Sequence, residues 1–248
     1  MKIRHTKPMP GQGKSLSEPL YKRVYNLVVE RIAQSQYLPG SMLPSEMDLA
    51  AELKVSQGTA RKAMIELEQN GIVQRRQGKG TFVTVRTPEN SLFHFFPLRD
   101  EASEQVSPQL TTENVIQRKA TASERKTLFG QPGSVFEINR IRHFREKPLS
   151  IEKSVVSTTL FPGLKDRQPL PNALYVVFQH SYSCIVLSAD EKLTAEKLGQ
   201  ELSEKVNLPA DTPVIKARRK AYDLQERVVE MRTSIYITDP VSYSVRLD

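Results

Sequence analysis

Apolar residues in the first third of the chain recur with the spacing of amphipathic helices. The first stripe begins at Leu20 and repeats at i+4, i+7, i+8 and i+12, which predicts one helix with a single buried face. The segment from Tyr37 to Gly40 is rich in turn-forming residues and is expected to end that helix. A short second helix is expected after Ser45, because Ser45 and Asp48 have the spacing of a capping box.

A third helix and a hairpin are predicted next. Ser56 is expected to cap this helix, and Asn70-Gly71 is expected to end it. Its inner face is predicted to consist of Ala60, Ala63, Met64 and Leu67. Two short β-forming segments at 72–73 and 81–85 flank a basic, glycine-rich turn at 74–80. Three helices followed by a hairpin are the elements of a winged helix-turn-helix, which we place at residues 19–85.

The rest of the chain alternates between strands and helices. Strands are predicted at 92–97, 113–121, 134–144, 149–157, 184–192, 213–223 and 227–238, and helices at 123–129, 171–180 and 194–206. The last helix is predicted from the stripe Ala195, Leu198, Leu202 and Val206. This order favours an α+β domain around an antiparallel sheet at 93–248. Residues 1–18 show no periodicity and are expected to form a disordered basic tail, and residues 86–92 are expected to form a linker.

Charge separates the two predicted domains. The chain of 248 residues carries a net charge of +8, and residues 1–86 hold 14 basic and 7 acidic side chains, or +7 of that total. A basic module joined to a nearly neutral one is typical of a nucleic-acid-binding domain attached to a domain with another task. No apolar run reaches the roughly 18 residues of a membrane span, and the first residues lack the apolar core of a secretory signal. The single cysteine, Cys184, excludes an intramolecular disulfide, and we expect a cytoplasmic protein.

The third helix and the wing carry side chains suited to DNA. In a helix-turn-helix the N-terminal residues of the second helix of the pair meet base edges in the major groove. Gln57 can pair with adenine, and Arg61 can pair with guanine or hold a phosphate. The wing tip adds cations and backbone N–H groups for phosphate or minor-groove contact. The expected contacts are Ser56, Gln57, Gly58, Thr59, Arg61, Arg75, Arg76, Gln77, Gly78 and Lys79.

Several stretches of residues 19–84 match one known pattern. They include Pro19-Leu20-Tyr21, Leu38-Pro39-Gly40, Leu43-Pro44-Ser45-Glu46, Val55-Ser56, Thr59-Ala60-Arg61 and Gly78-Lys79-Gly80-Thr81-Phe82-Val83. With them the segment resembles the winged-helix domain of GntR-type transcription regulators. The resemblance implies operator DNA as partner and adds Ser45, Glu46 and Gly80 to the expected contacts. Met47 and Gln57 stand where this family usually has arginine, so we expect an operator that differs at the base facing Gln57.

The second domain resembles, more loosely, the effector-binding UTRA domain of the HutC branch. The matching stretches include Pro132-Gly133-Ser134-Val135-Phe136, Ile138-Asn139-Arg140-Ile141-Arg142, Lys147-Pro148-Leu149-Ser150-Ile151-Glu152, Phe161-Pro162-Gly163-Leu164, Ala173-Leu174-Tyr175 and Val229-Glu230. The resemblance implies a ligand-binding domain with a chorismate-lyase-like α+β fold, and a homodimer.

The effector site is expected around two arginines. Arg140 and Arg142 lie two residues apart on a predicted strand, so they face the same way and can together hold an anion. Glu230 and Tyr236 share one face of the last predicted strand. The resemblance implies effector contacts at Arg140, Arg142, Glu152, Tyr175, Glu230 and Tyr236, and Ser91 and His94 are candidates for the same pocket. The alternative is that the two arginines lie on a solvated face and Tyr236 fills the core.

Two departures from sugar-phosphate-responsive relatives bear on the ligand. Ala173 replaces a serine, and Ile237 stands where arginine is frequent in those relatives. The loss of both donors disfavours a phosphorylated sugar and favours a small anionic metabolite such as a carboxylate.

Other classes of function remain as alternatives. A lyase-related enzyme is disfavoured because the four histidines are scattered and Cys184 sits in an apolar strand, so no catalytic residue, metal or cofactor is expected. A winged helix that binds protein predicts weak salt dependence, whereas phosphate contacts predict a steep one. The favoured function is a dimeric, nucleoid-associated bacterial repressor on a pseudo-palindromic operator, with a ligand-responsive activator as the alternative.

Overall fold

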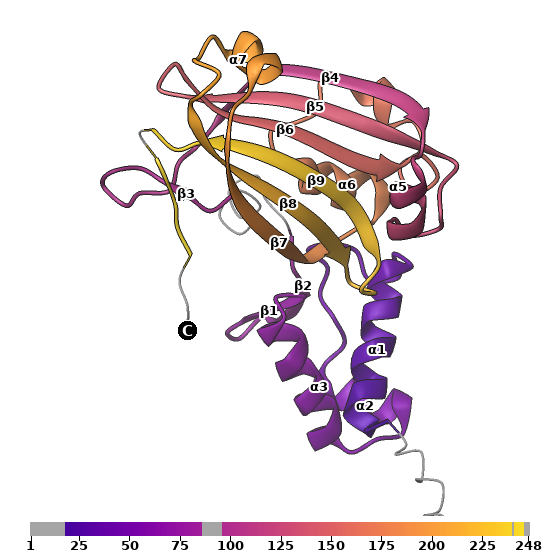
Figure 1. Ribbon diagram of the computed structural model, residues 1–248. Coiled ribbons are helices and arrows are strands. Elements are labelled where there is room, and N and C mark those ends of the chain that lie inside the picture. The colour runs from indigo at the N-terminus through magenta and orange to yellow at the C-terminus, as the bar shows by residue number, and fades with distance from the viewer. Residues whose placement is uncertain (1–17, 86–95, 240, 246–248) are drawn as a thin grey trace, which may run out of the picture.

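The computed structural model describes residues 18–85, 96–239 and 241–245. Its N-terminal part is a three-helix unit with a two-stranded hairpin, and it lies against one end of a much larger sheet (Figure 1). The helices and strands of this part are α1 (Leu20–Ala33), α2 (Glu46–Leu53), α3 (Gln57–Gln69), β1 (Val73–Arg76) and β2 (Gly80–Val83). The predicted winged helix-turn-helix is confirmed.

Local capping explains where these helices begin and end. Ser45 and Asp48 form the predicted capping box at the start of α2, and the Ser56 hydroxyl accepts the backbone N–H of Thr59 at the start of α3. Gly71 follows α3 with a φ of 66°, a left-handed conformation that glycine adopts without strain. The apolar stripes of the three helices then meet in one buried core.

The hairpin differs in detail from its prediction. Residues 74–76, expected in the turn, belong to β1, where Gln74 pairs with Phe82 and Arg76 pairs with Gly80. The turn is therefore restricted to residues 77–79. Strands of a hairpin pair through backbone hydrogen bonds, which do not require apolar side chains. The polar residues 74–76 therefore gave no sequence signal for β1.

The C-terminal part is built on a six-stranded antiparallel sheet in the order β4-β5-β6-β9-β8-β7 (Figure 1). Its strands are β4 (Gln109–Lys119), β5 (Ser134–Phe144), β6 (Lys147–Ser157), β7 (Val186–Lys197), β8 (Pro213–Asp223) and β9 (Val228–Ile237). The remaining elements are β3 (Leu98–Arg99), paired with β10 (Ser242–Tyr243), the helices α5 (Ala122–Thr127), α6 (Leu174–Tyr182) and α7 (Gln200–Val206), and the 3-10 turn η1 (Leu164–Arg167). The predicted antiparallel α+β fold is confirmed.

Several predicted elements have other limits, among them the strand predicted at 184–192, which is observed at Val186–Lys197, and the helix predicted at 171–180, which is observed at Leu174–Tyr182. The helix predicted at 194–206 is wrong in its first part, because β7 continues to Lys197 and α7 begins only after Gly199, whose φ is 79°. The strand predicted at 92–97 lies mostly outside the described residues, and Phe96 and Pro97 are not in a strand. The strand predicted at 113–121 is observed as β4 at Gln109–Lys119. It ends before Thr121 because Thr121 caps α5. None of the described helices combines the length and apolar character needed to cross a membrane.

Side chains alternate between the two faces of the sheet. We call the face that carries Phe136, Ile138, Arg140 and Arg142 of β5 the inner face. Helix α6 covers one end of it, and β3 and β10 lie over the other. The opposite, outer face packs against α7 around Ile235 and against α5 elsewhere. The ligand site predicted from Arg140 and Arg142 therefore lies under α6 rather than on the open face.

The two parts of the molecule share a core. Ile185, just before β7, and Leu224, in the β8–β9 turn, are buried in the same cluster as Val28 and Ile32 of α1. Polar contacts flank this cluster: the Ser35 and Ser183 hydroxyls lie 2.7 Å apart, and Gln179 donates to the Thr84 carbonyl. The winged helix is thus packed against the sheet through residues adjoining α6.

Candidate nucleic-acid interface and ligand site

The N-terminal end of α3 presents the predicted base-reading residues to solvent. Gln57, Gly58 and Arg61 are exposed, whereas Ala60 and the other predicted inner residues are buried. Arg61 forms no ion pair with a described residue, so its guanidinium is available to a base or a phosphate. A Cβ at Gly58 would meet only the Ser56 hydroxyl, at 3.9 Å, so crowding within the protein does not require a glycine there.

Hydroxyls and carboxylates near this end of α3 are engaged within the protein. The Ser56 and Thr59 hydroxyls lie 2.8 Å apart, and the Ser45 hydroxyl donates to Asp48 at 2.6 Å. Glu46 forms an ion pair with Arg75, with 2.8 Å between the charged atoms. These side chains shape the surface, and their predicted contacts with DNA remain predictions.

The cations of the wing differ in whether they form ion pairs within the protein. Arg75 bridges Glu46 of α2 and Glu68 of α3, at 2.8 and 3.2 Å, and so holds the wing against the helices. Arg76 lies over the Phe82 ring, while Lys79 is exposed in the turn with Gln77 and Gly78. Arg76 and Lys79 are therefore better placed for phosphate contact than Arg75. Gly80 has a φ of 116° and a Cβ there would lie 3.1 Å from the Met42 sulfur, so its role is structural at least in part.

The inner face of the sheet brings together a buried polar cluster. Register aligns Glu113 with Arg140 and Glu152, and Arg142 with Ser150 and Tyr236, across neighbouring strands. The cluster contains four guanidiniums and four carboxylates: Arg140, Arg142, Arg219, Arg232, Glu113, Glu152, Glu191 and Glu230. The alternative of a solvated arginine face is wrong, because Arg140 is only 2% exposed and Arg142 only 3%.

Arg140 and Arg142 converge on one loop. Arg140 pairs with Glu113 and donates to the Asn172 carbonyl at 3.1 Å. Arg142 donates to Glu152 at 3.0 Å and to the same Asn172 carbonyl, also at 3.0 Å. The Asn172 side-chain oxygen accepts a further bond from Arg142. Asn172 lies just before α6, so the two predicted arginines fix the start of that helix.

The second half of the cluster links α6 to β9. The Tyr175 hydroxyl donates to Glu230 at 2.6 Å, and Arg232 donates to the other Glu230 oxygen at 2.8 Å. Arg232 also donates to the Ser154 hydroxyl at 3.0 Å. Burial alone would raise the pKa of Glu230, but Arg232 and Tyr175 lower it. Tyr175 and Glu230, both predicted from the resemblance, are thus in direct contact.

Electrostatics keep most of the cluster ionised. Burial would raise the pKa of Glu152, but the charges of Arg142 and Arg232 outweigh it and lower the pKa to about 2. Burial and the neighbouring charge of Arg142 lower the pKa of Arg140 to about 10. The Nε of Arg140 is buried and has no acceptor among the described residues. An additional acceptor beside Arg140 would therefore satisfy a donor and stabilise its charge.

Sequence reasoning located part of this cluster. It missed Glu113, Asn172, Glu191, Arg219 and Arg232, which come from separate strands and loops. The period-2 alternation of β8 and β9 could have placed Arg219 and Arg232 on the buried face. Predicted Tyr236 is 1% exposed and packs edge-on against Phe96 with centroids 6.0 Å apart, so it also fills the core beside the cluster. Predicted Ser91 and His94 lie outside the described residues.

Two positions used to infer the ligand fall in different places. Ala173 is the N-cap of α6, next to Asn172. Ile237 packs on the outer face against α7, so a donor there would point away from Arg140 and Arg142. Only Ala173 therefore bears on the chemistry of this cluster.

Cys184 is buried in the core, where burial raises its pKa to about 12, as expected for a packing residue.

Two protein families match the chain. Residues 20–83 match the bacterial regulatory proteins of the gntR family, and residues 105–242, more than half of the chain, match the UTRA domain. The chain is a GntR-family transcriptional regulator. Members of this family bind operator DNA through the winged helix and an effector through the UTRA domain. Both resemblances inferred from the sequence are therefore confirmed.

Relatives of this GntR-family regulator match along most of their length. The mannosyl-D-glycerate transport/metabolism system repressor MngR of Escherichia coli (strain K12) is 23% identical over 231 residues, which cover 92% of this chain and 95% of MngR. The transcriptional regulator GgaR of the same strain is 30% identical over 226 residues, which cover 87% of this chain and 86% of GgaR. Such relatives are regulators rather than enzymes, which confirms the expected class of protein.

Solved structures share the fold. The ligand-binding domain of a GntR-family regulator from Bordetella bronchiseptica matches with a TM-score of 0.55 and 23% identity over 62% of this chain and 98% of that chain. PhnF from Mycobacterium smegmatis matches with a TM-score of 0.53 and 19% identity over 91% of this chain and 99% of that chain.

We expect Gln57→Arg to change the preferred operator base. An arginine at this exposed first position of α3 would favour guanine where glutamine favours adenine, with a discrimination of about 1–3 kcal/mol. Selection of operator sequences from a random DNA pool by both proteins measures the change. Gln69→Arg, at the far end of the same helix, is the matched control and should select the wild-type sequence. An unchanged sequence with Gln57→Arg would contradict the assignment.

The lowered pKa of Glu152 predicts acid sensitivity. Its folded-state pKa of about 2 lies below the ordinary 4.5, so its stabilisation is complete above pH 4.5 and is lost as the pH falls toward 2. Glu152→Gln should remove up to about 3 kcal/mol at pH 7, at 1.36 kcal/mol per pKa unit. Its stability should then depend less on pH between 4.5 and 2. Urea unfolding across this range tests the slope, with exposed Glu204→Gln as control, and an equal slope in Glu152→Gln and wild type would refute the assignment.

Proposed function

We propose that this regulator is a dimeric repressor whose affinity for a pseudo-palindromic operator is lowered by a small carboxylate bound on the inner face of the sheet. We infer a carboxylate as the ligand from the surroundings of the Arg140 guanidinium. Its Nε is a buried donor without an acceptor in the described structure, and burial together with Arg142 lowers its pKa. A carboxylate oxygen would supply the missing acceptor and offset the repulsion between the two guanidiniums.

The geometry of the winged helix supports the DNA part of the proposal. Gln57 and Arg61 are exposed on α3, and Arg76 and Lys79 are exposed on the wing. One helix and one wing per chain give few contacts, and two copies would double them and impose half-sites related by two-fold symmetry. The MngR relative is named a repressor, which supports repression as the direction of control.

Helix α6 supplies a physical route between ligand and DNA. Its first turn touches the polar cluster through Tyr175, which donates to Glu230. One turn later Gln179, itself buried, donates to the backbone carbonyl of Thr84, directly after wing strand β2. Its C-cap Ser183 contacts Ser35, after α1. A ligand that displaces Asn172 or Tyr175 would therefore shift contacts that seat the winged helix.

The coupling obeys linkage. A ligand that favours the arrangement mismatched to the operator weakens DNA binding, and DNA weakens ligand binding by the same factor. A coupling of about 1–3 kcal/mol corresponds to a change of about 5–150-fold in affinity. Rearrangement of contacts at a domain boundary is sufficient for an effect of this size.

We expect the double variant Arg140→Gln/Glu113→Gln to bind operator normally and to lose its response to small carboxylates. Replacing both partners removes the guanidinium without leaving Glu113 as a buried unpaired charge, which would itself be destabilising. The test is fluorescence-anisotropy titration of operator DNA with and without a panel of organic acids. The matched control is Lys216→Gln/Glu196→Gln, an ion pair on the outer face of the same domain. A double variant that responds like wild type, or that loses operator binding as well, would overturn the assignment.

We expect Gln179→Met to uncouple the two domains. Methionine fills a similar volume but leaves the Thr84 carbonyl without the Gln179 donor, so α6 loses its bond to the wing. Operator affinity alone and ligand affinity alone should stay within about threefold of wild type, while the coupling factor falls toward 1. Titration of each ligand in the presence of the other measures that factor. Exposed Gln200→Met is the control, and an unchanged coupling factor in Gln179→Met would exclude this route.

A further inference from the structure

The outer face of the sheet holds a row of cations that the inner-face site does not use. Register places Lys192, Arg218, Thr233 and Lys153 in line across β7, β8, β9 and β6. We call these four residues the basic row. Adjacent strands lie about 4.8 Å apart, so the row extends across about 14 Å. All three of its cations are exposed, and none forms an ion pair with a residue of the described structure.

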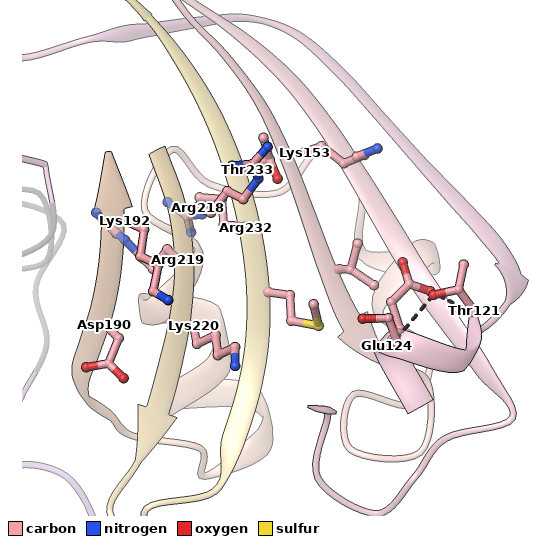
Figure 2. A pocket seen from close by; sticks show the side chains of 13 residues that line it. Thr121, Glu124, Lys153, Asp190, Lys192, Arg218, Arg219, Lys220, Arg232 and Thr233 are labelled. Carbon is pink, nitrogen blue, oxygen red and sulfur yellow. Dashed lines mark hydrogen bonds between the residues drawn. The ribbon is translucent and has the colours of Figure 1, made fainter. Parts of the chain in front are cut away.

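The row lines a hollow rather than a flat surface. A groove of about 530 Å³ lies between the α5 side and the centre of the sheet, with the row along it and Val155 and Met231 on its apolar floor. Figure 2 shows Lys192 and Arg218 on one side of this groove and Lys153 on the other. Its volume lies within the usual range of small-molecule sites, about 300–1,000 Å³.

Charge in the groove is not balanced locally. Lys220 adds a fourth cation, and Asp190, which accepts from the Tyr222 hydroxyl, is the acid opposite it. Glu124 also lines the groove, but its charge is paired with Arg118. Two more cations line the groove, Arg219 and Arg232, but they are paired with Glu191 and Glu230. The four cations without an ion pair in the described structure, set against Asp190, leave a net charge of +3.

Neighbouring cations of the outer face form ion pairs, unlike the cations of the basic row. On the same face Lys216 pairs with Glu196, and Arg118 pairs with Glu124 and Glu137. In the basic row, by contrast, Lys192 and Arg218 occupy directly opposed positions on β7 and β8. Like charges placed opposite one another destabilise a sheet. An anion between them would convert that repulsion into attraction.

From this arrangement we infer a second ligand site, for a small molecule that carries two or more phosphate or carboxylate groups. The cations at the two ends of the row, Lys192 with Arg218 and Lys153, hold separate anionic groups. Thr233, between them, offers a hydroxyl to the connecting part of the ligand. The cations of the basic row lie on the face opposite Arg140 and Arg142, so the site is distinct from the proposed effector site, although Arg219 and Arg232 of the polar cluster also line the groove.

The test uses the full chain and sodium tripolyphosphate, with fructose 1,6-bisphosphate as a second probe. Isothermal titration calorimetry should detect one site on the wild type, with an affinity that falls as salt rises. The variant Lys192→Gln/Arg218→Gln should bind at least tenfold more weakly. Lys205→Gln, on α7 beside the outer face, is the matched control and should bind as the wild type does. Arg140→Gln/Glu113→Gln should also bind normally, which separates this site from the inner face.

A second readout does not need ligand. Because Lys192 and Arg218 repel each other, neutralising both should leave the melting temperature of the free protein unchanged or raise it, while Lys205→Gln should not raise it. Equal probe binding by wild type and Lys192→Gln/Arg218→Gln, or no binding by wild type, would overturn the inference. A change in oligomeric state in that variant, measured by sedimentation, would instead identify the row as a contact between protein copies and would also overturn it.

Discussion

Buried charge is the constraint on which the C-terminal domain depends. Four arginines and four glutamates lie on the inner face of the sheet, and removing charged groups from water costs several kcal/mol each unless they are paired. Four arginines facing four glutamates meet that cost almost completely. The Nε of Arg140 is a buried donor that has no acceptor among the described residues, which is why the proposed ligand is placed there.

The same cluster fixes the helix that connects the two domains. Asn172 accepts from both Arg140 and Arg142, and Tyr175 donates to Glu230, so both ends of the polar cluster meet at the start of α6. At the other end of α6 the packing is apolar: Ile185 and Leu224 enter the core of the winged helix. The buried polar cluster and the apolar contact with the winged helix thus lie at opposite ends of one short helix, α6.

Sequence patterns predicted much of this architecture because helix caps and the alternation of side chains along a strand depend on residues close together in the sequence. The capping box at Ser45 and the cap at Ser56 depend on residues three positions apart, and the inward direction of Arg140 and Arg142 depends only on the alternation of a strand. The partners of those arginines depend on register between distant strands. Glu113 lies 27 residues from Arg140, and no local pattern relates them. The helix predicted at 194–206 was wrong because an exposed edge strand and a short helix, separated by Gly199, together imitated one apolar stripe.

If the inner-face site and the winged helix are coupled, DNA and the small ligand must weaken each other's binding by the same factor, so both directions are measured. The full chain is titrated with DNA from its own upstream region, with and without each member of a panel of organic acids. For any compound that responds, its affinity is then measured with and without that DNA. We expect sequence-selective DNA binding that falls steeply with salt and that one carboxylate weakens, and we expect DNA to weaken the binding of that carboxylate by the same factor. Selective DNA binding that no carboxylate changes, or unequal factors in the two directions, would contradict it.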